Sequence, residues 1–331
     1  MIMDTIDFVI LWVDGNDPKW REEKAKYDNA SSDDREIRYR DWDNLQYWFR
    51  GVEKFAPWVN KIHFVTYGHL PKWLNTNNKQ LNIVNHKDFM PEGSLPVFNS
   101  NALEVNLHRI KNLSERFVYF NDDVFIIKKV DKKDFFINGI PCDSAIMSPV
   151  IQENKNGIGN TIVNNLAIIN EFFNKKEQMT KKITNWFNIK YGIENIKNLL
   201  LLPWHDFTGF YEMHIASSFL KKTYQEVWKR NQEELTKTTF DKFRDPKQDV
   251  NQWVFRDWQI ASDNIIPRSI KFGYNFKLEE AFDEAIKAII KQKYKIICLN
   301  DSNNIKNFED KKQKINDAFN KILPDKSSFE I

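Results

Sequence analysis

Four short segments in the first 130 residues have the hydrophobic pattern of β-strands. Each is apolar or alternating over four to seven positions and is bounded by turn-forming residues. The segments are FVILWV at 8–13, KIHFVTY at 61–67, residues 81–84, and FVYF at 117–120. The last is an unbroken apolar block, which is typical of a strand covered on both faces.

Helical periodicity fills the intervals between these segments. Residues 45–55 place apolar side chains every three or four positions, and Pro57 ends this predicted helix. A second helix is expected from about Asn101, with Leu103, Leu107 and Ile110 on its apolar face. Strands and helices in alternation predict an α/β fold with a mostly parallel, doubly wound sheet.

The pattern changes after Cys142. Residues 158–190 and 209–235 have helical spacing, 295–301 predicts a strand, and 304–323 a lysine-rich helix. No Pro/Gly/Ser-rich linker separates these parts, so we expect a helical insertion within one α/β unit. The expected division is an α/β part at 1–141, a mainly helical insertion at 142–238, and a return to the core with C-terminal helices at 239–331.

Composition narrows the class of protein. The 331 residues are 41% hydrophobic, the mean hydropathy is −0.60, and no window approaches the roughly 18 apolar residues of a spanning helix. The N-terminal apolar run lacks a preceding basic region, so it predicts a strand and not a signal peptide. Two cysteines are too few for a disulfide framework, which favours a cytoplasmic location.

The charge balance gives no reason to expect a nucleic-acid partner. The net charge is only +3. Lysines are concentrated in the last third, where either contact with anionic lipid or solvated helix faces would explain them.

Acidic residues follow two of the predicted strands. Asp14 and Asp17 come after the first, and Asn121, Asp122 and Asp123 come directly after FVYF. Ligands of doubly wound sheets bind at the carboxyl ends of the strands, and paired carboxylates suit a hard divalent cation. An acidic turn that caps a helix is the alternative, and both interpretations remain open.

Three further groups are candidates for chemistry. Glu104 and His108 are four positions apart on one predicted helix, with Arg109 beside them, and either substrate contacts or a surface pair would explain them. His205 lies beside Asp206 in LLPWHDFTGF, an arrangement that suits a general base or a structural histidine. Arg244 and Asp249 flank a proline turn and would bind a diphosphate and a metal, or each other. His214 is expected in the middle of a helix.

Taken together, these segments resemble the Stealth family of sugar-phosphate transferases. This family includes bacterial capsular polysaccharide phosphotransferases and the catalytic part of N-acetylglucosamine-1-phosphotransferase. The resemblance lies in IDFVILWVDGNDPKW, in residues 35–130 with PVFNSNALEVNLHRI and FVYFNDDVF, in the segment from PWHDFTGF to QEVW, and in YKIICLND.

The resemblance implies a Rossmann-like, glycosyltransferase-A-like fold and a UDP-sugar donor. It implies transfer of a sugar-1-phosphate to a hydroxyl of an oligosaccharide or lipid-linked glycan, with release of UMP. It also implies surface-polysaccharide synthesis and peripheral association with the inner face of a bacterial membrane. Residues 1–141 would bind donor and metal, and 142–238 the acceptor.

The same resemblance assigns roles to individual residues. His205 is the expected general base, Arg109 and Arg244 are expected to hold phosphate oxygens, and Mg²⁺ or Mn²⁺ is expected on acidic side chains. The expected metal ligands are Asp122, Asp123 and Asp249, and the expected substrate-binding residues are Asp14, Arg40, Glu104, His108 and Asn121. Two rival functions share these features: a metal-dependent glycosyltransferase that releases UDP, and a carbohydrate-binding scaffold.

Overall fold

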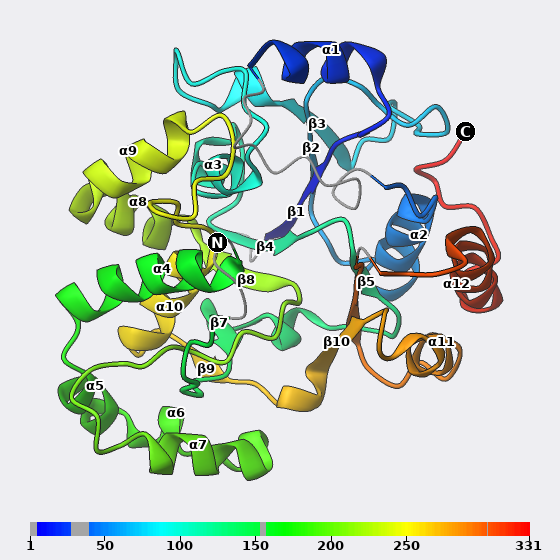
Figure 1. Ribbon diagram of the computed structural model, residues 1–331. Coiled ribbons are helices and arrows are strands. Elements are labelled where there is room, and N and C mark those ends of the chain that lie inside the picture. The colour runs from blue at the N-terminus through cyan, green and yellow to red at the C-terminus, as the bar shows by residue number, and fades with distance from the viewer. Residues whose placement is uncertain (1–4, 28–39, 153–156, 303) are drawn as a thin grey trace.

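A five-stranded sheet forms the centre of the computed structural model, which describes residues 5–27, 40–152, 157–302 and 304–331 (Figure 1). Its strand order is β3-β2-β1-β4-β8. The first four strands are parallel and β8 is antiparallel to β4. The strands are β1 (Ile6–Trp12), β2 (Ile62–Thr66), β3 (Leu81–Asn85), β4 (Arg116–Phe120) and β8 (Ser217–Leu220). The predicted α/β class and mostly parallel sheet are confirmed.

Side-chain alternation along these buried strands separates two hydrophobic cores. Phe8, with Phe64 and Phe120, belongs to the core on one face, whereas Val9 and Tyr119 belong to the core on the other. Because successive side chains of a strand point to opposite faces, an apolar block such as FVYF can supply both cores.

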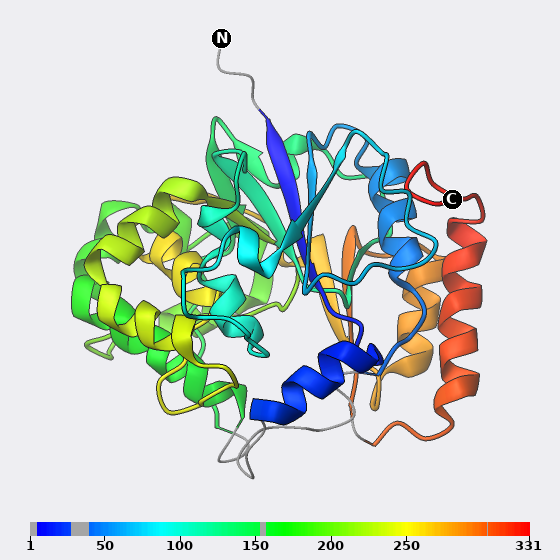
Figure 2. The same cartoon turned by 90° about the horizontal axis from the view of Figure 1, so that it is seen from above.

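Helices cover both faces of the sheet, as Figure 2 shows from above. The first core is closed by α2 (Leu45–Phe55), α11 (Phe282–Ile290) and α12 (Phe308–Ile322). The second is closed by α3 (Ser100–Glu104), α4 (Ile158–Phe172), α8 (Lys221–Arg230), α9 (Gln232–Phe240) and α10 (Trp253–Ala261). None of the helices in the described residues is long and apolar enough to cross a bilayer.

Two small sheets flank the centre. One has the order β10-β11-β5 and the other β6-β7-β9. Their strands are β5 (Val124–Ile126), β6 (Phe136–Ile137), β7 (Ile140–Asp143), β9 (Ile266–Pro267), β10 (Gly273–Lys277) and β11 (Ile296–Asn300). The predicted strand at 295–301 is β11, and its end lies beside the segment that follows β4, because Leu299 N donates to Asp123 O at 2.9 Å.

The remaining elements are short. They comprise α1 (Pro18–Tyr27), α5 (Lys175–Lys181), α6 (Ile183–Trp186), α7 (Asn195–Leu200), and the 3-10 turns η2 (His86–Asp88), η3 (Leu107–Arg109), η4 (Lys132–Asp134), η5 (Ile189–Glu194) and η6 (Ile270–Phe272). The helix expected from Asn101 is interrupted, because α3 ends at Glu104 and only η3 follows.

The expectation of a helix over 209–235 was wrong at its beginning. Residues 209–216 form a loop with one isolated bridge at Phe210, and 217–220 form strand β8, before α8 starts at Lys221. Local spacing suggested a helix, but the small residues Ser217 and Ser218 are buried against β4, where strand pairing is worth more than helical propensity. A segment of the expected insertion thus completes the central sheet.

Candidate functional site

The carboxyl ends of the parallel strands bring the first predicted acids to one edge of the sheet. Asp14 follows β1, and Asn121, Asp122 and Asp123 follow β4, the neighbour of β1. Asp14 N donates to Nε2 of His69, which follows β2, at 2.7 Å. The Asp14 carboxylate accepts from Asn16 N at 2.8 Å, so it also stabilises its own loop.

Asp122 and Asp123 form a carboxylate pair with room for a cation. Surrounding protein, and then the Asp123 carboxylate, raise the pKa of Asp122 to about 7, although the residue is exposed on the surface. Asp123 Oδ2 accepts from the Cys298 thiol at 3.3 Å. Its Oδ1 is buried without a hydrogen-bond partner in the described part of the chain. Two adjacent acids and an unpaired carboxylate oxygen suit a bound divalent cation.

His214 lies directly beside these acids. Its Nε2 is 3.1 Å from Nδ2 of Asn121. One ligand atom each from His214, Asp123 and Cys298 lie within 4.8 Å of one another, a group able to hold a metal ion. His214 has φ of +46°, an uncommon backbone conformation for a non-glycine residue that often marks functional sites. Its expected place in the middle of a helix was wrong.

His205 lies elsewhere. Its side chain is 84% exposed, and Nδ1 is 2.7 Å from Oδ1 of Asp206. No hydrogen bond or ion pair joins it to another predicted site residue within the ranges that the structure describes. The structure therefore brings His214, and not His205, to the acids.

Glu104 occupies a buried position behind the acids. Its Oε1 accepts from the Tyr119 hydroxyl and its Oε2 from Gln252 N, each at 3.2 Å. Burial raises the pKa of Glu104, and the neighbouring Arg244 and His214 side chains oppose that rise. Glu104 is thus close enough to both residues to interact with them electrostatically.

His108 and Arg109 lie away from Glu104 and the acids, because helix α3 ends at Glu104 and both residues belong to the separate turn η3. The His108 ring packs 5.7 Å from Tyr224, and burial lowers its pKa to about 3. The Arg109 guanidinium lies 4.8 Å above the Trp228 ring. Both line a surface pocket of about 420 Å³ between η3, α8 and α9, so neither is placed beside the acids.

Arg244 and Asp249 meet the start of α3. Arg244 Nη2 donates to Ser100 Oγ at 2.7 Å and remains exposed. Asp249 Oδ2 accepts from the side-chain amides of Asn99 at 2.9 Å and Asn101 at 3.0 Å. Asp249 therefore fixes the loop that carries Arg244, although its Oδ1 is buried without a hydrogen-bond partner among the described residues.

Arg40 fastens another segment beside the acids. It donates two hydrogen bonds to Asp301, after β11, at 3.0 and 2.7 Å, and Trp42 Nε1 donates to the same carboxylate at 3.1 Å. Asp41, between them, contributes to the raised pKa of Asp122. These three hydrogen bonds to Asp301 thus hold residues 40–42 at the rim of the site.

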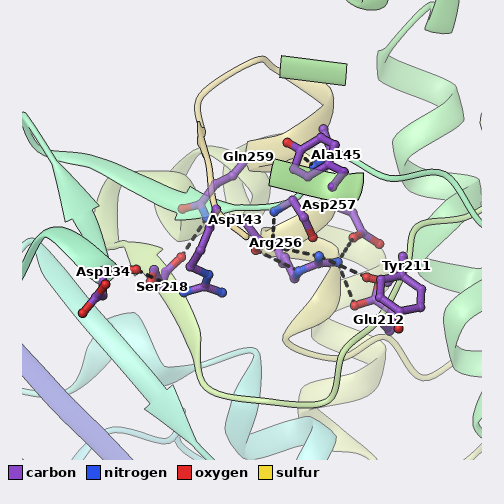
Figure 3. Close-up of polar contacts among 12 residues, drawn as sticks. Asp134, Asp143, Ala145, Tyr211, Glu212, Ser218, Arg256, Asp257 and Gln259 are labelled. Carbon is purple, nitrogen blue, oxygen red and sulfur yellow. Dashed lines mark hydrogen bonds and ion pairs between the residues drawn. The ribbon is translucent and has the colours of Figure 1, made fainter. Parts of the chain in front are cut away.

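A buried ion cluster supports the loop that carries His214 (Figure 3). Arg256 of α10 binds Asp143 with two hydrogen bonds of 2.9 Å, and donates to Glu212 at 2.8 Å and to Tyr211 O at 3.2 Å. Burial, and then the Glu212 carboxylate, raise the pKa of Asp257 well above its usual range, so it holds a proton. Arg256 therefore ties the loop two residues before His214 to a rigid helix.

Sequence reasoning missed His214, Cys298, Asp301 and the Arg256 cluster. Asp301 stands at the end of a predicted strand, the same signal that identified Asp122 and Asp123, whereas Cys298 lies in the middle of that strand. Arg256 gave no such signal, because its partners are far apart along the chain.

Comparison with known proteins adds independent evidence. Stealth protein conserved region 1 matches residues 4–32 and conserved region 2 matches residues 38–142. The chain is 44% identical to capsular polysaccharide phosphotransferase WcwK of Streptococcus pneumoniae, over 99% of this chain and 98% of that one. It is 40% identical to receptor polysaccharide phosphotransferase WefC of Streptococcus oralis, over 99% and 100%.

Among solved structures, the chain is similar to galactosyltransferase LgtC in complex with donor and acceptor sugar analogues. The TM-score is 0.40 with 11% identity, over 94% of this chain and 95% of that one. The sequence matches, which extend over nearly the whole of both chains, decide the family. This chain belongs to the Stealth family and is a transferase of the phosphotransferase type.

Proposed function

We propose that this enzyme transfers a sugar-1-phosphate from a UDP-sugar to a hydroxyl of a glycan acceptor. The products are a phosphodiester and UMP, and the process is capsular or surface polysaccharide synthesis. The names of relatives such as WcwK and WefC support the process. The observation that carries the chemistry is His214 beside Asp123 at the carboxyl end of the parallel sheet.

Asp122 and Asp123 are the proposed ligands of Mg²⁺ or Mn²⁺. The partnerless Oδ1 of Asp123 and the raised pKa of Asp122 fit a site whose charge is balanced by a cation. With such an ion bound, the site gains Lewis-acid neutralisation of the donor's phosphates. Mg²⁺ and Mn²⁺ prefer oxygen ligands, so the carboxylates and not the Cys298 thiol would hold the ion.

His214 is the proposed general base. The acceptor oxygen attacks the sugar-bearing phosphorus, the hydroxyl proton passes to the imidazole, and the bond from this phosphorus to the oxygen of UMP breaks. An imidazole can take this proton near neutral pH. The bond between the sugar and its phosphate oxygen is kept, so the anomeric configuration is kept.

Arg244 is the proposed contact for the transferred phosphate, because it is exposed and its charge reaches Glu104 on the same side as His214. Glu104 would hold the charge of Arg244 in place. Asp14, Arg40 and Asn121 would shape the donor site. His108 and Arg109 pack against α8, so they are not among the residues proposed to bind the donor or its phosphates.

Identification of the released nucleotide tests this proposal. The purified enzyme, UDP-sugars, Mn²⁺ and an oligosaccharide acceptor should yield UMP, and the variant His214→Ala should lose it. His205→Ala is the matched control and should retain it. Release of UDP would show a glycosyltransferase, and UMP formation that depends on His205 but not His214 would overturn the assigned base.

A further inference from the structure

An unusual concentration of exposed apolar side chains marks the helical segment at 183–204. Of the sixteen large hydrophobic residues that are exposed in the described part of the chain, eight fall within these 22 positions. We call them the apolar surface: Ile183, Ile189, Ile193, Ile196, Leu199, Leu200, Leu202 and Trp204. Ile189 is 95% exposed and Ile193 75%. Patches of this kind mark sites of interaction.

The opposite side of the segment is firmly anchored, so this exposure is built into the fold. The Asn198 side chain is buried and bonds both Met147 N at 2.6 Å and Ala145 O at 2.8 Å. Tyr191 is fully buried, and its hydroxyl accepts from Ala145 N at 3.0 Å. With these polar anchors pointing inward, the isoleucines and leucines cannot turn into the core.

Four of the outward side chains follow one another along two short consecutive elements, η5 and α7, and we call them the stripe: Ile189, Ile193, Ile196 and Leu200. The backbone is kinked at Gly192, with φ of +54° and ψ of −130°, so these side chains do not belong to one continuous helix face. In Figure 1, α6 and α7 lie at the margin of the molecule, away from the central sheet. The stripe is thus free to meet a flat partner.

The charged residues around the stripe are mainly basic. Four lysines of this region are exposed, Lys176, Lys181, Lys182 and Lys190, whereas Lys175 is buried. Lys181 is paired with Glu177 and Lys197 with Glu194, and Trp204 stands at the end of the apolar run. Protein–protein interfaces are depleted in lysine and enriched in tyrosine and arginine. Aliphatic residues with lysines and a tryptophan are instead the composition of helices that lie in a membrane interface.

We propose that the apolar surface docks onto a bilayer containing anionic lipid. The isoleucines and leucines enter the boundary between head groups and acyl chains, Trp204 lies at head-group level, and the lysines contact lipid phosphates. Docking would present the acceptor side of the enzyme to lipid-attached glycan. This inference goes beyond the proposed reaction, since it concerns a surface and a partner that the chemistry does not define.

Vesicle binding tests the inference without any turnover. The variant Ile193→Cys can be labelled selectively with an environment-sensitive fluorophore, because Cys142 and Cys298 are both buried. We expect a blue shift and co-sedimentation with phosphatidylglycerol/phosphatidylcholine vesicles, and weaker binding with phosphatidylcholine alone or at high salt.

A matched pair of variants assigns the binding to this surface. Leu200→Glu should lower vesicle binding at least tenfold. Val163→Glu on α4, whose side chain is 50% exposed, introduces the same charge elsewhere and should leave binding unchanged. Both variants should form UMP with a soluble acceptor as the parent does, so a failure of docking is distinguishable from a failure of the proposed reaction.

Two results would overturn the inference. One is vesicle binding that is absent, or equal in the parent and Leu200→Glu. The other is a dimer in light scattering that Leu200→Glu dissociates, because the surface would then contact a second copy of the chain.

Discussion

Nδ2 of Asn121 lies 3.1 Å from Nε2 of His214. This contact joins the end of β4 to the loop before β8, two segments 93 positions apart in the chain. In this orientation Asn121 donates to Nε2 and Nδ1 carries the ring proton, so the acceptor hydroxyl must displace the Asn121 amide before Nε2 can take its proton. Asn121 therefore orients the proposed base beside Asp123.

Replacement of His214 should abolish most of the turnover. We expect His214→Gln to lower kcat by roughly 10²–10⁴-fold, the usual contribution of a general base, with little change in stability. The measurement is UMP release under saturating donor. His205→Gln, on the exposed loop, serves as the control, and equal losses in the two variants would contradict the assignment.

Metal affinity should depend on pH because Asp122 must lose its proton to bind. With its pKa raised to about 7, Asp122 is mostly protonated at pH 6, so Mn²⁺ affinity should fall by about tenfold per unit below pH 7 and level off above it. Electron paramagnetic resonance of free Mn²⁺ at pH 6, 7 and 8 measures this. Constant affinity over that range would show that ion binding does not require Asp122 to lose a proton between pH 6 and 8.

Asp249 gives a contrasting prediction. Its Oδ2 accepts from the amides of Asn99 and Asn101, and its Oδ1 is buried without a hydrogen-bond partner among the described residues. Because these amides hold the carboxylate at the start of α3, Asp249→Ala should reduce stability while Mn²⁺ affinity stays within about twofold. Asp123→Ala should lose Mn²⁺ binding. If Asp249→Ala also loses it while remaining folded, the metal site extends further than the described contacts indicate.

Loss of the Arg256 side chain should lower the free energy of unfolding substantially. Arg256→Met removes the cation shared by Asp143 and Glu212 and leaves buried carboxylates unpaired, a loss of about 3–5 kcal/mol. Asp257→Asn imitates the protonated acid and should cost much less. Urea denaturation at pH 7 measures both, and similar losses would mean that the charge of Arg256 is not what stabilises the cluster.

Mild acid should destabilise the fold through two buried histidines. Burial lowers the pKa of both His86 and His108 to about 3, whereas an unfolded histidine titrates near 6.5. The unfolded state therefore binds protons first, and the unfolding free energy should fall as the pH drops from about 6.5 toward 3. His108→Asn should show a smaller fall between pH 7 and 5 in urea denaturation. An unchanged fall would assign the effect to other groups.

The sequence by itself determined the alternation of strand and helix, the parallel sheet and the acids at its edge. It could do so because side-chain period and strand-end chemistry are local: FVYF followed by Asn121–Asp123 indicates both a buried strand and a site where it ends. The same rule would have found Asp301 after β11. At 217–220 the local spacing predicted a helix, but pairing with β4 makes this segment the strand β8.

Only the tertiary structure decided which histidine lies beside the acids and that the apolar surface at 183–204 is exposed to solvent. His205 and His214 lie close together along the chain, but strand β8 binds the edge of β4 and draws His214 alone to Asp123. Arg256 likewise gathers Asp143, Glu212 and Asp257 from three separate segments. Such contacts depend on the packing of residues distant along the chain, and local periodicity carries no information about them.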